Sequence, residues 1–178
     1  MSTGLVHMLA LDIISDFMTP EQALARLQQQ CSRSEHSTGQ VRSRLKRWDA
    51  KERMQGRPGF SAIQMDDIVA SLVKERFVDD SRFAGAYVRD KARFAKWGPA
   101  KIKYNLKMLG VEEGIIKDAL EENGEMFVQD ALRELAVRKW KSMKQETDVY
   151  MKRAKLVRFL VGRGFSYSQI MEFMKDLG

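Results

Sequence analysis

Apolar residues recur at intervals of three and four positions along most of the chain, which is the spacing of a helix with one buried face. Val41, Leu45 and Trp48 show this spacing early in the chain, and Leu132 and Leu135 show it later. No segment alternates apolar and polar residues with the period of two that a half-buried strand requires. The pattern therefore predicts an all-α fold.

Capping residues and breakers divide the pattern into separate helices. Thr19-Pro20-Glu21-Gln22 and Ser166-Tyr167-Ser168-Gln169 both have the spacing of a capping box, in which a hydroxyl and a glutamine side chain satisfy the first free amides. Another helix is expected to begin at Asp66 or Asp67. Residues 51–61 contain two glycines and a proline among charged residues, which predicts a loop.

One arrangement of a helix, a glycine stop, an apolar residue and a second helix occurs twice, and every matched pair of positions is separated by the same interval. The matched positions are Ile102, Leu106, Gly110, Val111, Ile116 and Leu120 with Leu156, Leu160, Gly164, Phe165, Ile170 and Met174. The apolar residue after each glycine is expected to pack back on the finished helix, as it does at Schellman-type helix ends.

An interrupted earlier copy precedes these two. Val41 and Leu45 correspond to Ile102 and Leu106, and Ile68 and Leu72 correspond to Ile116 and Leu120, but the first interval is longer than the second. The excess is close to the length of the 51–61 loop. We interpret that loop as an insertion in a first copy that lacks the glycine stop.

The predicted architecture is three tandem three-helix repeats that form an elongated, curved array. Its predicted parts are a weakly specified lead-in at residues 1–18 and repeats at residues 19–80, 81–124 and 125–178. The alternative is a single compact helical bundle in which the similarity between copies is accidental.

Composition limits the compartment and the kind of partner. The 178 residues carry a net charge of +7 and include one cysteine, Cys31, so no intramolecular disulfide can form. The apolar stretch Leu5 to Ile14 is too short to span a bilayer. We expect a soluble cytoplasmic protein whose partner is polyanionic or has an acidic face.

Basic residues gather in three segments that include the middle helix of each repeat. The candidate binding residues are Arg42, Arg44, Lys46 and Arg47 in the first, Arg89, Arg93, Lys101, Lys103 and Lys107 in the second, and Lys152, Arg153, Lys155, Arg158 and Arg163 in the third. Their corresponding positions favour one basic face that meets DNA phosphate or an acidic protein surface. The alternative is an ordinary solvated side of each helix.

Other reactive residue types have structural interpretations. Trp48, Trp97, Trp140 and Tyr104 could stack on nucleic-acid bases, but their spacing among apolar residues favours packing in the core or between repeats. Asp79 and Asp80 stand where a helix cap is expected.

The sequence predicts no catalytic or metal site and no cofactor. Cys31 and His36 have no recognisable third partner, and His7 and His36 are too few for a persuasive metal site. The phosphate-binding loop GxxxxGK[ST] is absent, which argues against an intrinsic ATPase. We therefore expect a protein that is not an enzyme.

The repeat pattern resembles the RecX family of bacterial regulatory proteins. The resemblance is strongest from Phe77-Val78-Asp79-Asp80-Ser81-Arg82-Phe83-Ala84 through Gly98-Pro99 to the LxxxGV pattern that ends at Val111, and it continues in Arg163-Gly164-Phe165-Ser166-Tyr167-Ser168-Gln169-Ile170. The first repeat departs from the family pattern because it carries the 51–61 loop.

The resemblance implies a function in DNA repair, recombination and the SOS response. A RecX-type protein would bind filaments of the RecA recombinase on single-stranded DNA, as a monomer, and restrain filament growth, strand exchange, ATP hydrolysis and co-protease activity. The alternative is a helical module that binds DNA or RNA independently of sequence and needs no recombinase partner.

Overall fold

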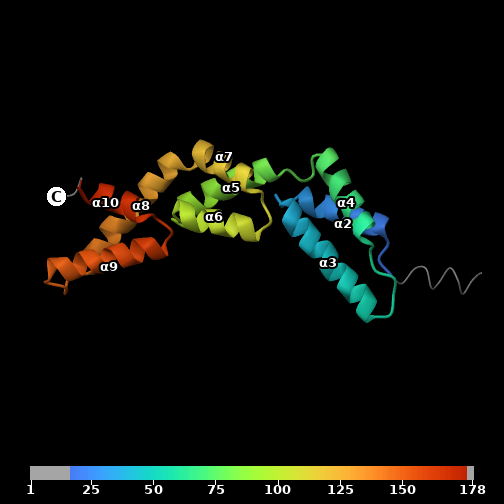
Figure 1. Ribbon diagram of the computed structural model, residues 1–178, viewed down its shortest axis with the longest axis horizontal. Helices are drawn as coiled ribbons and strands as arrows, with labels where there is room; N and C mark the ends of the chain where they lie inside the picture. Colours follow the sequence, from blue (N-terminus) through green and yellow to red (C-terminus); the bar gives the residue numbers. More distant parts are fainter. Residues whose placement is uncertain (1–16, 176–178) are drawn as a thin grey trace, which may run out of the picture. The chain divides into compact units, whose positions relative to one another are not determined.

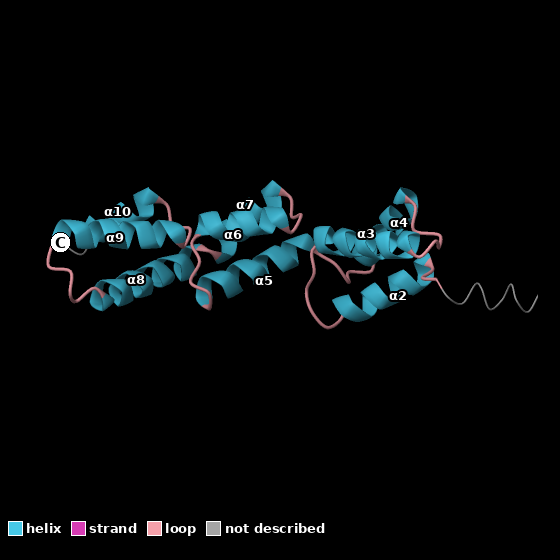
Figure 2. Ribbon diagram, turned by 90° about the horizontal axis from the view of Figure 1, so that it is seen from below, coloured by secondary structure: helices cyan, strands magenta, loops and turns pink. Residues whose placement is uncertain are grey.

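The computed structural model describes residues 17–175, and every regular element in that range is a helix (Figures 1 and 2). The chain divides after Asp79 into two compact units. The prediction of an all-α chain of three-helix repeats is confirmed, with three helices in residues 17–79 and six in residues 80–175. Residues 1–16, which hold His7 and most of the expected lead-in, lie outside the described residues.

The first unit packs three helices around one apolar cluster. The helices are α2 (Pro20–Cys31), α3 (Thr38–Met54) and α4 (Ala62–Lys74). Leu27, Leu45 and Leu72, one from each helix, are all at most 1% exposed. Because these leucines occupy the predicted apolar stripes, the helical spacing identified the core of this unit correctly.

Four helices begin with the same reciprocal capping box. In the Thr19–Gln22 box the Gln22 amide donates to the Thr19 hydroxyl at 3.3 Å, and the Thr19 amide donates to the Gln22 side chain at 3.1 Å. The same pair of bonds joins Ser37 to Gln40, Ser61 to Gln64 and Ser166 to Gln169.

The Ser61 box corrects one predicted boundary. Helix α4 begins at Ala62, one turn earlier than the expected start at Asp66 or Asp67. The reason is that Ser61 and Gln64 already satisfy the amides of the first turn, so the aspartates lie inside the helix.

The first repeat contains the glycine stop that the sequence pattern indicated it lacked. Gly56 has φ 69°, and the Arg57 amide donates to the Glu52 carbonyl at 3.0 Å. The Val111 amide makes the same bond to Leu106 at 3.1 Å, and the Phe165 amide to Leu160 at 3.2 Å. Gly56 therefore corresponds to Gly110 and Gly164, both of which also have positive φ.

A longer middle helix hid this correspondence. Helix α3 has 17 residues, against 10 in its counterpart α6, and it continues through residues 51–54, where the loop was expected to begin. Glu52 takes the place of the final leucine and is only 6% exposed. The Arg57 guanidinium lies 3.9 Å from its Oε2 atom. A buried carboxylate broke the apolar stripe, so the sequence pattern appeared to stop at Trp48.

The second unit contains two repeats that share one core. Its helices are α5 (Asp80–Arg93), α6 (Pro99–Met108), α7 (Glu113–Asn123), α8 (Glu125–Ser142), α9 (Val149–Gly162) and α10 (Tyr167–Lys175). Helix α5 contacts both α7 of its own repeat and α8 of the next. One continuous buried cluster runs from Phe83 to Ile170, so repeats two and three form a single packed body.

Two glycines join these repeats end to end. The Gly98 amide donates to the Arg163 carbonyl at 2.8 Å, and the Ala100 amide donates to the Gly164 carbonyl at 3.0 Å. The first turn of α6 thus supplies donors to the carbonyls that follow α9. A Cβ atom on Gly98 would lie 2.3 Å from the backbone of Gly164, so only a residue without a side chain allows this contact.

Candidate nucleic-acid and protein interface

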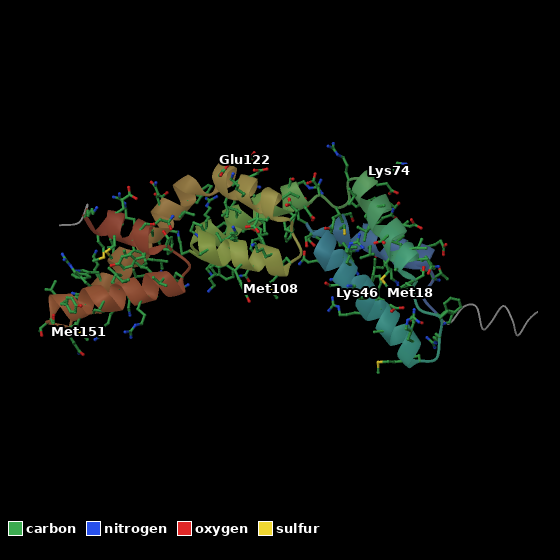
Figure 3. The ribbon with its side chains drawn as sticks, viewed as in Figure 1. Met18, Lys46, Lys74, Met108, Glu122 and Met151 are labelled. Atoms are coloured by element: carbon green, nitrogen blue, oxygen red, sulfur yellow. The ribbon has the colours of Figure 1, made fainter. Side chains whose placement is uncertain are left out.

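The predicted basic residues of the first repeat lie on α3 in two different settings. Arg42 is exposed and pairs with Asp66 on α4, whereas Arg44 is half-buried and donates to the Gln30 side chain on α2. Lys46 and Arg47 are exposed (Figure 3 labels Lys46), and neither has an ion pair within the described part of the chain. Two of the four predicted cations therefore remain available to an external anion.

A single carboxylate holds two of the predicted lysines on α6. Glu113, in the first turn of α7, lies 2.6 Å from Lys103 Nζ and 2.7 Å from Lys107 Nζ. Hydrogen bonds from Lys103 and Lys107, reinforced by their charges, lower the pKa of Glu113 from 4.5 to about 2. The two lysines therefore already have a partner, and an external phosphate would have to displace it.

The lowered pKa of Glu113 predicts that this carboxylate stabilises the fold in a pH-dependent way. Because the folded-state pKa of Glu113 lies below its unfolded value, its contribution is complete above about pH 4.5 and is lost as the pH falls towards about 2. We expect the difference in melting temperature between the wild-type chain and Glu113→Gln to shrink across this window. Thermal unfolding monitored by circular dichroism at descending pH measures it, and a constant difference would contradict the assignment.

Four of the predicted cations lie over aromatic rings instead of beside carboxylates. Lys101 Nζ is 4.6 Å from the centroid of the Trp97 ring, and Lys152 Nζ is 4.5 Å from that of Trp140. Arg163 stands 5.3 Å from the centroid of Phe159, and Arg93 stands the same distance from that of Phe94. Cation–π contacts hold these groups in place without neutralising their charge.

Two of the remaining predicted residues of the second unit are exposed cations without an ion pair in the described residues. Lys155 pairs with Glu146, and Arg89 donates to the Asn123 side chain at 2.6 Å. Arg153 and Arg158, both on α9, are exposed and have no ion pair in the described residues. Among the predicted residues of this unit, they are the strongest candidates for contact with a polyanion.

The second unit arranges its two basic middle helices in tandem. Helices α9 and α6 follow one another in both views of the ribbon (Figures 1 and 2), and the bonds from Gly98 and Ala100 connect the end of α9 to the start of α6. This connection places Lys101 next to Gly164 and its neighbour Arg163. Residues from two of the three predicted clusters are thereby brought together.

The aromatic predictions divide into confirmed and wrong ones. Trp97 and Trp140 pack against the core of the second unit and Trp48 against that of the first, as expected. Tyr104 is 64% exposed, so the expectation that it packs is wrong. It lies two positions from Ile102 and two from Leu106, which places it on the opposite side of α6 from that buried pair.

Tyr104 has an apolar neighbour on the same outer side of its helix. Met108, one turn further along, is 71% exposed and marks that side in Figure 3. Lys103 and Lys107 lie beside this pair in the sequence, so aromatic, apolar and cationic groups alternate on the outer side of α6. The sequence could have identified this surface, because Tyr104 stands two positions from each of the buried residues Ile102 and Leu106.

The described residues do not assemble the alternative chemistry considered for the chain. Cys31 is buried as a free thiol, and burial raises its pKa, which disfavours a nucleophilic thiolate. The Nδ1 atom of His36 lies 2.8 Å from the Ser34 carbonyl. Within residues 17–175, no group of three or more histidine, cysteine, aspartate or glutamate side chains is placed to hold a metal ion. No helix in this range is long and apolar enough to cross a membrane.

The fold and its exposed chemistry define an all-α repeat protein with cationic middle helices. Residues 79–120 match the family profile "RecX, second three-helix domain", and residues 128–174 match "RecX, third three-helix domain". The chain therefore belongs to the RecX family of regulatory proteins.

Curated relatives with the name "Regulatory protein RecX" support this assignment. The protein from Clostridium acetobutylicum is 37% identical over 122 residues, which are 66% of this chain and 56% of that protein. The protein from Leuconostoc mesenteroides is 29% identical over 145 residues, 82% of this chain and 50% of its own length. The chain thus spans about half the length of the curated relatives it matches.

Solved structures agree with the fold. The crystal structure of RecX from Lactobacillus salivarius has a TM-score of 0.76 at 21% identity and covers 89% of this chain and 96% of that one. A second crystal structure, of a regulatory protein RecX, has a TM-score of 0.73 at 22% identity and covers 88% of this chain and 71% of that one. At these identities the likeness concerns the fold alone.

Proposed function

We propose that this chain binds RecA filaments on single-stranded DNA and inhibits them, as a regulator without turnover of its own. The observation that carries the proposal is the tandem of basic helices α9 and α6 inside the two repeats that match the RecX family. A filament presents DNA phosphate alongside protein, and a row of cations fixed on rigid helices fits such a target.

Contacts within the chain divide the proposed contact residues into three groups. Arg153, Arg158, Lys46 and Arg47 are exposed and have no carboxylate partner within residues 17–175, so they are the first to meet the filament. Lys103 and Lys107 contribute only after they release Glu113. Lys101 and Arg163 are held over rings, so they lose little conformational freedom on binding.

The test is the DNA-dependent ATPase of RecA with substoichiometric amounts of the chain. We expect ATP hydrolysis to fall and labelled chain to sediment with preformed filaments. A chain that neither lowers ATP hydrolysis nor binds filaments would overturn the proposal. A charge-reversed chain carrying Arg153→Glu and Arg158→Glu tests the contact residues, and it should inhibit ATP hydrolysis less than the wild-type chain does.

A second candidate function is a nucleic-acid-binding module that needs no recombinase. The exposed Tyr104 and Met108, each next to a lysine in the sequence, favour it, because bases stack on exposed aromatic rings and phosphates pair with neighbouring cations. It predicts tight binding to bare single-stranded DNA with a steep loss of affinity as salt is added. Weak binding to bare DNA together with firm binding to filaments rejects it in favour of the recombinase proposal.

A further inference from the structure

The third repeat contains an apolar cavity whose lining shares only Arg153 with the proposed filament contacts. It has a volume of about 210 Å³ and opens between α8, α9 and α10. Val137 and Trp140 of α8, Leu156 of α9 and Met174 of α10 line it. The volume is below the roughly 300–1,000 Å³ of pockets that hold cofactors or whole small ligands. It suits one bulky side chain.

Two cations complete the lining of this cavity. Lys141 and Arg153 are both exposed, and neither has an ion pair within residues 17–175. No acidic residue lines the cavity. A third cation is close by, because Lys152 Nζ lies 4.5 Å from the centroid of the Trp140 ring. An apolar floor with cations and no acids is complementary to an apolar side chain flanked by carboxylates.

The apolar character extends beyond the cavity along α9. Val149 is 57% exposed and stands one turn before Arg153 and two turns before Leu156, on the same face of the helix. Val137 on α8 is 39% exposed. Water therefore covers apolar surface that a partner would bury, and removal of that surface from water supplies a driving force for binding.

Two other cavities within the described residues lack this combination. The cavity between α2 and α4 is lined by Glu21 and Asp67 and has no cation. The cavity next to α7 and α8 is lined by Asp130, Glu172 and Arg133, so its charges are mixed.

We propose that the cavity bounded by Trp140, Leu156 and Arg153 is a docking site for an acidic segment of a partner protein that inserts one bulky apolar side chain. The inference goes beyond filament inhibition, because it assigns a peptide-binding site whichever protein supplies the segment. Lys141 and Arg153 meet the carboxylates, and the aliphatic floor receives the inserted side chain. This combination is typical of the central anchors of protein interfaces, in which a desolvated pocket holds a single residue.

A nucleobase is the rival occupant. A base requires an open aromatic face, whereas the Trp140 ring already carries the Lys152 ammonium over it. The rest of the floor is aliphatic. A phosphate would also leave the apolar floor uncovered. The lining therefore favours a protein segment, and an oligonucleotide becomes an arm of the test.

The test uses the full chain labelled with 5-fluorotryptophan and the peptide Glu-Asp-Glu-Leu-Phe-Asp-Glu-Asp. The fluorine resonance of Trp140 is assigned with a Trp140→Phe chain. We expect it to shift on addition of peptide and to saturate, while the Trp48 and Trp97 resonances stay in place. A peptide in which serines replace Leu-Phe should bind at least about tenfold more weakly, because the apolar anchor is gone.

Variants separate the apolar and electrostatic contributions. Val137→Asp places a carboxylate at the partly exposed lining and should weaken peptide binding about tenfold or more, and Lys141→Ala with Arg153→Ala should weaken it about fivefold. The matched controls are Val161→Asp, which changes an exposed valine of α9 outside the cavity, and Arg138→Ala with Lys144→Ala. These should bind within about twofold of the wild-type chain.

Three results would overturn the proposal. They are a Trp140 resonance that does not move at millimolar peptide, equal loss in the cavity variants and their controls, and a Trp140 shift that oligothymidylate produces but the peptide does not. The last result would assign the cavity to a nucleobase.

Discussion

Replacing Gly98 with alanine is expected to lower the unfolding free energy of residues 80–175 by about 3 kcal/mol. The backbone of Gly98 has φ −80°, which any residue adopts, so the cost is steric. The added Cβ would lie 2.3 Å from the carbonyl carbon and oxygen of Gly164 and 2.5 Å from the Phe165 amide nitrogen. These are backbone atoms just after the end of α9, so a rotamer change cannot relieve the clash. The bonds that join the two repeats must lengthen.

Amide hydrogen exchange measures this effect helix by helix. Protection of Ile102 and Leu160 should fall, whereas Leu45, in the first unit, serves as an internal reference. Gly162→Ala is the matched control, because nothing lies within 4 Å of a Cβ at that position on α9. It should be neutral or stabilise by about 0.5 kcal/mol. Equal protection in the Gly98→Ala and Gly162→Ala chains would contradict the proposed role of the junction.

The helices and repeats were accessible from the sequence where apolar spacing and glycine stops agree. Leu106 with Gly110 and Leu160 with Gly164 stand at one constant offset, and in the structure the amide of the residue after each glycine donates to the carbonyl of the leucine. Gly56 was missed because the buried position before it is Glu52, whose burial with Arg57 no hydropathy pattern predicts. The early start of α4 was missed although Ser61 and Gln64 have the same spacing as the recognised boxes.

The candidate site was predictable only as a set of charges. Spacing placed Lys103 and Lys107 on one helix, but their shared carboxylate comes from α7, and its position depends on how the chain turns at Gly110 after α6. The position of Lys152 over Trp140 likewise depends on a contact that crosses from α9 to α8, whereas Lys101 and Trp97 are only four positions apart in the sequence. The sequence shows which cations are clustered, whereas tertiary packing decides which of them remain available to a partner.

Substitution of the two unpaired arginines of α9 is expected to cause the largest loss of filament binding. Arg153→Ala with Arg158→Ala should lower affinity about tenfold. If both arginines contact single-strand phosphates, the slope of log affinity against log salt should fall by about 1.4, since each contact contributes roughly 0.7. Thermal stability should stay unchanged, because both side chains are exposed and have no ion pair within residues 17–175.

Lys103 and Lys107 provide the comparison that separates availability from charge. Lys103→Ala with Lys107→Ala removes the same formal charge but should cost severalfold less affinity, since these lysines must first leave Glu113. Glu113→Gln should raise filament affinity, because it releases both ammonium groups. This gain is opposite in sign to the loss from the lysine substitutions, and removal of a merely structural contact would not produce it. Filament co-sedimentation over a salt series measures all three variants.

Arg158→Ala alone separates phosphate contact from peptide docking, because Arg158 lies outside the Trp140 cavity. Equal losses for the arginine and lysine pairs, with Glu113→Gln unchanged, would show that intramolecular pairing does not control which cations bind.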